Sequence, residues 1–254
     1  MRKRQKFVVT ALLLTGGLLG SQAVPLEWRY GLIGLLSLTS WVLAAWSLRE
    51  GLVGVEWLTV VVPSALFTAG VGFFYILLPA NILARLLIGV LFGVGQYALL
   101  LTANIFSVAA IRTIALFRAA SAVGFVMTLV TGFLLYDTIL SFRVGFWLVM
   151  PAVAGVSFLL ALPALWSMEL EEKVSVRIIK YSVWMAVLLG LLSGAISVWS
   201  VSLVVTSLFL ATMLYVYLGI TQHHFAQRLF SRTVWEYVTV GVVVLVTVLI
   251  TASL

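Results

Sequence analysis

Few residues in this sequence have side chains that could do chemistry. Its 254 residues include eight Asp and Glu, two His and no Cys. Without cysteine there is no disulfide, no thiolate metal site and no cysteine nucleophile. Asp137 is the only aspartate, which excludes the paired aspartates of an intramembrane aspartyl protease or of an aspartate-rich magnesium site. We therefore expect no catalytic residue, no metal and no cofactor of a familiar kind, which disfavours an enzyme.

The histidines and lysines add no catalytic pattern. His223 and His224 are neighbours, and on a helix they would point about 100° apart. A rhomboid-type serine protease needs a Gly-x-Ser-Gly nucleophile and a buried histidine, and a retinal protein needs a lysine in the middle of a hydrophobic segment. The sequence contains neither arrangement. A membrane transferase with an unfamiliar site stays open as an alternative.

One group of uncharged polar residues is a candidate for ligand binding. Gln96, Tyr97 and Asn104 belong to one hydrophobic segment, and spacings of seven and eight put them on one helix face. Polar groups at membrane depth are candidates for function by default. These three side chains either hydrogen-bond a ligand or bond neighbouring helices to one another.

A second candidate group is charged. Five charged residues are predicted on the outer side of the membrane, each near the end of a span: Glu27, Arg29, Arg85, Asp137 and Arg143. Arginine forms strong, often bidentate hydrogen bonds with phosphate and carboxylate. We expect this group to hold a lipid phosphate or an anionic substrate. The alternative is that the charges extend to the interface and pair locally.

The elements that must position these residues are membrane-spanning helices. The chain is 63% hydrophobic and 9% charged, whereas soluble domains are about 25% charged. A helix needs about 20 apolar residues to cross a bilayer. The sequence therefore predicts an all-α, polytopic transmembrane helical bundle. Nine segments are long enough: 7–24, 31–48, 57–78, 86–109, 117–140, 145–166, 178–198, 201–220 and 233–253.

The basic residues predict how these helices are oriented. Cytoplasmic loops of membrane proteins are enriched in Lys and Arg. With residues 1–6 in the cytoplasm, twelve of the fifteen Lys and Arg fall on that side and three on the other. The net charge of +7 is then a signal of topology and not of nucleic-acid binding. We expect a cytoplasmic N-terminus and an extracytoplasmic C-terminus.

The whole chain, 1–254, is predicted to form a single integral membrane domain without a soluble part. Two of its segments have alternatives. The first, 7–24, also resembles a secretory signal, because a basic start and an apolar stretch lead to Ser21-Gln22-Ala23, with small residues at the two cleavage positions. The segment 104–118 either turns tightly near Arg112 or contains an amphipathic helix along the cytoplasmic face.

Small residues and prolines indicate how the helices pack. Small residues let helix backbones approach closely, and we expect them to serve packing within the bundle, or one stripe to bind another membrane protein. Pro63 and Pro151 lie inside predicted spans and should kink them or free a carbonyl. The small residues recur at four-residue steps: Gly89 and Gly93, Ala120, Gly124, Thr128 and Gly132, and Gly190 and Gly194.

Three stretches of the sequence are distinctive: 48–59 (LREGLVGVEWLT), 104–114 (NIFSVAAIRTI) and 136–143 (YDTILSFR). They resemble an uncharacterised family of multi-pass membrane proteins from small-genome, candidate-phylum bacteria. The resemblance implies a location in the bacterial plasma (inner) membrane. It carries no known activity, substrate or catalytic residue.

Two classes of function fit these observations. The first is binding or translocation of a lipid-like or small amphiphilic molecule by the outer charges and the polar face at Gln96. The second is a structural or assembly subunit of a larger membrane complex, held through small-residue helix faces. Membrane lipids are expected partners, membrane proteins are expected in the second case, and nucleic acid in neither.

Overall fold

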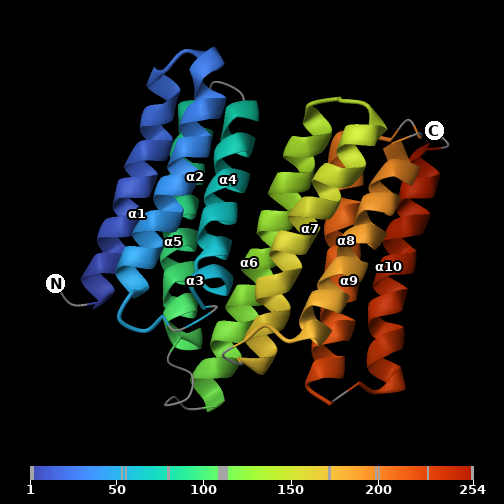
Figure 1. Ribbon diagram of the computed structural model, residues 1–254. Coiled ribbons are helices and arrows are strands. Elements are labelled where there is room, and N and C mark those ends of the chain that lie inside the picture. The colour runs from blue at the N-terminus through green and yellow to red at the C-terminus, as the bar shows by residue number, and fades with distance from the viewer. Residues whose placement is uncertain are drawn as a thin grey trace. The chain divides into compact units, whose positions relative to one another are not determined.

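The computed structural model describes residues 3–52, 54, 56–78, 81–107, 114–170, 173–197, 199, 201–227 and 229–252. Within these ranges it contains helices and no strand (Figure 1). The elements are α1 (Lys3–Gly20), the 3-10 turn η1 (Ser21–Ala23), α2 (Leu26–Leu48), α3 (Glu56–Thr59), α4 (Val62–Leu77), α5 (Ile82–Phe106), α6 (Ile114–Ser141), α7 (Phe146–Glu169), α8 (Val176–Ser197), α9 (Leu203–Phe225) and α10 (Ser231–Ala252).

In the described part of the chain, nine helical segments are long and apolar enough to cross a membrane. Each coincides with one of the nine predicted spans, so the prediction of an all-α polytopic bundle is confirmed. The orientation of the two termini stays a prediction. The alternative of a turn or an interfacial helix at 104–118 falls mainly on 108–113, which lie outside the described residues.

The prolines act differently in two spans. The third predicted span is divided, because α3 ends at Thr59 and α4 begins at Val62 with Pro63 in its first turn. Proline has no backbone N–H and is tolerated in the first turn of a helix but not in its interior. The disturbance expected at Pro63 is therefore a break between two helices. In contrast, α7 continues through Pro151 and Pro163.

The chain divides into two compact units, unit 1 (Met1–Thr131) and unit 2 (Gly132–Leu254), with the boundary inside α6. In unit 1, α1 packs against α2 and α5, and α2 against α4. The α1–α5 pair is antiparallel: a Cβ atom added to Gly89 would lie 2.9 Å from Leu19, and one added to Gly93 would lie 2.8 Å from Thr15. Both glycines therefore serve packing within the bundle, as predicted.

Unit 2 is built around α7, which packs against α8 and α9, while α10 packs against α9. A Cβ atom on Gly190 would lie 2.9 Å from the backbone oxygen of Met150 and 3.0 Å from the Cβ of Ala154. One on Gly132 would meet Leu214 at 2.6 Å. These glycines of the predicted stripes also permit close contact between helices of the same unit.

Candidate functional site

Gln96 lies in a hydrogen-bonded cluster inside unit 1. Its side chain and those of Ser40, Ser64 and Thr68 are at most 3% exposed. Gln96 Nε2 donates to Ser40 Oγ at 3.1 Å and also to Ser64 Oγ, and Thr68 Oγ1 donates to Ser40 Oγ at 2.9 Å. The bonds join α2, α4 and α5, which is how polar residues hold helices together in membranes. Of the two roles predicted for Gln96, this geometry supports bonding between helices.

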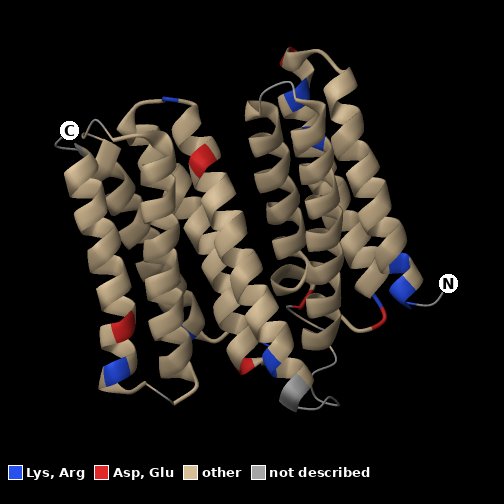
Figure 2. Cartoon of the chain, turned by 180° about the vertical axis from the view of Figure 1, so that it is seen from behind, with Lys and Arg blue, Asp and Glu red and all other residues tan. Residues whose placement is uncertain are grey.

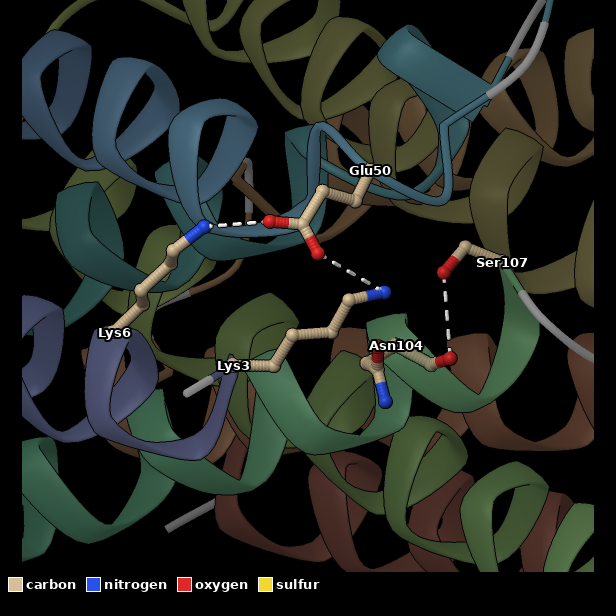
Figure 3. Close-up of polar contacts among 5 residues, drawn as sticks. All are labelled: Lys3, Lys6, Glu50, Asn104 and Ser107. Atoms are coloured by element: carbon tan, nitrogen blue, oxygen red, sulfur yellow. Dashed lines mark hydrogen bonds and ion pairs between the residues drawn. The ribbon is translucent and has the colours of Figure 1, made fainter. Parts of the chain in front are cut away.

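Tyr97 and Asn104 are half-buried, and no hydrogen bond described in the structure joins either side chain to that cluster. Asn104 is eight residues beyond Gln96 on α5, which is about 12 Å along the helix axis. Its backbone carbonyl accepts a hydrogen bond from Ser107 Oγ at 3.3 Å (Figure 3). The three residues therefore share one helix, but Gln96 and Asn104 lie at different depths in unit 1.

An ion-paired cluster occupies the end of unit 1 where α1 begins and α2 ends, which we name the Glu50 end. Glu50 accepts a hydrogen bond from Lys6 Nζ at 2.8 Å and forms an ion pair with Lys3 Nζ at 3.8 Å (Figure 3). Lys6 Nζ also lies 5.5 Å from the centroid of the Trp46 ring, within the range of a cation–π contact. The hydrogen bond to Lys6 lowers the pKa of Glu50 below its usual value. The sequence alone did not indicate this cluster, because Glu50 lies 44 residues from Lys6 along the chain and still farther from Lys3.

The opposite end of unit 1, which we name the Arg29 end, holds three of the predicted charges. Arg29 is fixed there by three acceptors: its Nε donates to Val24 O at 2.7 Å, its Nη2 to Gln22 O at 2.9 Å and its Nη1 to Gln22 Oε1 at 3.2 Å. Glu27 is exposed in the first turn of α2, where the helix dipole favours a carboxylate. Within the described ranges, neither Arg29 nor Glu27 forms an ion pair.

Arg85 belongs to the same end of unit 1. Leu19 lies opposite Gly89 and Thr15 opposite Gly93, so the antiparallel register puts Arg85 level with η1. The buried Nε atom of Arg85 and the buried Nε2 atom of Gln22 have no acceptor among the residues that the structure describes. The Arg29 end thus carries two guanidinium groups and two buried donors for which no described residue supplies an acceptor. Nothing in the sequence alone singled out Gln22.

Asp137 and Arg143 lie in unit 2, near the connection from α6 to α7. Asp137 is 7% exposed, and its Oδ1 accepts a hydrogen bond from Ser207 Oγ at 3.1 Å. Arg143 is exposed, with its backbone in the left-handed region (φ 48°), and its N–H donates to Leu140 O at 3.1 Å where α6 ends. No ion pair joins Asp137 to Arg143 or to another described residue. The grouping of all five outer charges into one site stays a prediction.

Charged residues in both units lie mainly at or near helix ends (Figure 2). Across the described residues, no group of three or more His, Asp or Glu is placed to hold a metal ion. The ring of His223 instead contacts its own helix, with Nδ1 2.8 Å from Gly219 O, and packs on Tyr237. The ring of His224 packs on Tyr181.

Comparison with known proteins adds a family but no activity. A family profile described as "Protein of unknown function (DUF5656)" matches residues 17–251, which include most of both units. No curated protein and no solved structure matches the chain. An inference about function therefore depends on the site itself.

Proposed function

The chain belongs to this family of unknown function, and from the residues at the Arg29 end of unit 1 we propose that it binds the anionic head group of a lipid-like or small amphiphilic molecule. Translocation of the same molecule is the second part of the proposal. The residues that would contact the head group are Arg29, Arg85 and Gln22.

One observation carries the proposal: the Nε of Arg85 and the Nε2 of Gln22 are buried without an acceptor among the described residues, at the same end of unit 1 as the fixed guanidinium of Arg29. A buried donor left unpaired costs about 1–3 kcal/mol. A phosphate group offers several acceptor oxygens, and its hydrogen bonds to guanidinium are among the strongest in proteins. An anionic head group would therefore satisfy both donors at once.

The depth of the site favours an amphiphile over a soluble anion. At the Arg29 end, the span Lys3–Ala23 ends and the span Ile82–Phe106 begins. The ends of membrane spans lie at the level of the lipid head groups. Trp28, next to Arg29, is 71% exposed, and exposed tryptophan is typical of the membrane interface. A molecule with a charged head and an apolar tail matches both the arginines at the Arg29 end and the apolar spans beside them.

Native mass spectrometry of the purified protein tests the binding. The protein is taken from nanodiscs that contain phosphatidylglycerol and phosphatidylethanolamine in equal amounts, and the retained lipids are counted. We expect the wild type to retain phosphatidylglycerol preferentially and Arg85→Gln to retain at least about tenfold less, as when a charge-assisted hydrogen bond worth about 1.5 kcal/mol or more is lost. Arg232→Gln is the matched control, because that arginine is 91% exposed and paired with Glu236 in unit 2.

Two further measurements in the same experiment identify the ligand and its binding site. If inorganic phosphate binds to the site as tightly as phosphatidylglycerol does, the apolar tail contributes nothing and the site recognises a free anion. If Arg85→Gln and Arg232→Gln retain equal amounts of phosphatidylglycerol, the Arg29 end is not the binding site.

A second assay separates binding from translocation. Proteoliposomes are loaded with a fluorescent phosphatidylglycerol, and a membrane-impermeant quencher is added outside. Translocation predicts that more than half of the fluorescence is lost, because lipid from the inner leaflet reaches the quencher. Loss of only the outer half, as in protein-free vesicles, would restrict the function to binding.

A further inference from the structure

Among the described residues of unit 2, Asp137 is the one buried acid inside a membrane span, and the head-group site in unit 1 does not use it. Asp137 lies in α6, four residues before the end of the span Leu116–Ser141, which is about 6 Å along the helix axis. Its side chain is 7% exposed. A carboxylate in such a place is expensive unless it is paired or neutralised.

No described cation neutralises Asp137. On α6 itself, Tyr136 is engaged by Ser157 Oγ at 2.8 Å and Arg118 lies near the opposite end of the helix. Arg143, beyond the end of α6, forms no ion pair with a described residue. On α9, the titratable residues begin at Tyr215, eight residues beyond the hydrogen-bond partner of Asp137. Tyr217 lies ten residues beyond Ser207 on α9, and Glu169, His223 and His224 lie in the last turns of α7 and α9, away from Asp137.

The hydrogen-bond partner of Asp137 has two acceptors in reach and only one hydrogen. Ser207 Oγ lies 3.1 Å from Asp137 Oδ1 and 3.0 Å from the backbone oxygen of Val204. A serine hydroxyl donates one hydrogen bond and accepts through its lone pairs. If its hydrogen goes to Val204 O, the hydrogen between Ser207 and Asp137 must come from the carboxyl group.

We propose that Asp137 binds a proton within the membrane and exchanges it reversibly, with Ser207 as the partner of the protonated form. In that form the carboxyl O–H donates to Ser207 Oγ, and Ser207 Oγ–H donates to Val204 O, so both observed contacts carry a hydrogen. On release, the O–H bond of the carboxyl breaks, the electron pair stays on the carboxylate, and the proton passes to water at the head-group layer. Ser207 then turns its hydrogen to the carboxylate.

Infrared spectroscopy of the full chain in liposomes tests the proposal. We expect the wild type to show the carbonyl stretch of a protonated carboxyl group at neutral pH, and Asp137→Asn to lose it. Ser207→Ala should shift the band to higher frequency, because the carboxyl group loses its acceptor. Thr206→Ala is the matched control and should leave the band in place, because Thr206 Oγ1 donates to Ser202 O at 3.2 Å.

The outcomes separate the proposal from its alternatives. Loss of the band at alkaline pH and its return at neutral pH support a reversible site. A band that sodium ions abolish at constant pH would overturn the proposal in favour of a sodium site. Identical spectra of the wild type and Asp137→Asn, with both proteins monodisperse, would show that Asp137 holds no proton. Asp137→Glu keeps a carboxyl group and serves as the control for misfolding. If Asp137→Glu retains the band, the loss of the band in Asp137→Asn is due to the missing carboxyl group.

Discussion

At the residue scale, Gln96 links three helices that a hydrophobic contact alone would not hold in register. In a membrane, lipid tails are as apolar as the helix surfaces, so interhelical hydrogen bonds carry part of the stability. We predict that Gln96→Leu, of similar size, lowers the free energy of unfolding by about 1–2 kcal/mol, since such bonds contribute about 0.6 kcal/mol on average. Equilibrium unfolding in mixed micelles with increasing SDS measures the change.

Tyr97→Phe is the control for this prediction. Tyr97 is half-buried and no hydrogen bond of its hydroxyl group to a described residue is found, so the variant should stay within about 0.5 kcal/mol of the wild type. If Gln96→Leu is as stable as Tyr97→Phe, the Ser40–Ser64–Thr68–Gln96 cluster does not stabilise unit 1.

Glu50 gives the protein a predicted pH dependence. Its pKa is lowered in the folded state by Lys6 and Lys3. A carboxyl group with a lowered pKa contributes stability above its unfolded value, which is near 4.5, and this contribution is lost as the pH falls through the folded value. We predict that the melting temperature of the wild type decreases as the pH is lowered from neutral to below about 4.5. The melting temperature of Glu50→Gln should decrease less over the same change in pH.

The comparison with Glu27→Gln makes this test specific. Glu27 forms no ion pair with a described residue, so its variant should keep the acid sensitivity of the wild type. Equal slopes of melting temperature against pH for the wild type and Glu50→Gln would contradict a stabilising role for the Glu50 end. High salt should weaken the effect, because Glu50 is exposed.

At the scale of the element, close contact between α7 and α8 depends on Gly190. An added methyl group there would meet the backbone of α7, at Met150 O, and the Cβ of Ala154. A backbone atom cannot move aside as a flexible side chain does, so the helices must separate. We predict that Gly190→Ala lowers the free energy of unfolding by about 1–3 kcal/mol, the usual cost of overpacking, as measured by SDS titration.

Gly155, on the same helix pair, provides the matched control. It lies in α7 with open space around the position of a Cβ atom. Because alanine is a better helix former than glycine by about 1 kcal/mol, Gly155→Ala should be neutral or stabilising. A result in which both variants lose stability equally would show that the glycines matter for another reason than interhelical distance.

The elements themselves were largely predictable. Nine apolar runs separated by charged or turn residues indicated nine spans, and each is present in the described chain. The break between α3 and α4 was not foreseen as a break, although Pro63 marked its position. Proline restricts the local backbone, but whether the chain kinks or starts a new helix depends on the neighbouring contacts of Val60 and Val61, which are buried.

At the scale of the whole molecule, the distribution of basic residues predicts the topology. A phosphatase that is active only outside the cytoplasm, fused after Leu254, should be active, and a cytoplasmic fluorescent reporter at the same position should be dark. The same reporters fused after Gln227, between α9 and α10, should give the reverse result. Activity that places both chain termini on one side of the membrane would contradict nine spans with the N-terminus inside.

What the sequence by itself determined is the class of the protein, the number of its spans and the residues that could bind something. These follow from composition and length, because a bilayer accepts only continuous apolar helices of a certain length. The contacts were decided by the tertiary structure. Gln96 meets Ser40 and Ser64, 56 and 32 residues away, and Asp137 meets Ser207, 70 residues away.

The reason is physical. In water, a helix shows its buried face by the alternation of apolar and polar residues. In lipid, both the inner and the outer face of a helix are apolar, so the rotation and register of each helix leave little trace in the sequence. Only the folded chain shows that Gln96 is enclosed between helices and that Asp137 lies buried beside one serine hydroxyl. It also shows that the donors of Arg85 and Gln22, at one end of unit 1, have no acceptor among the described residues.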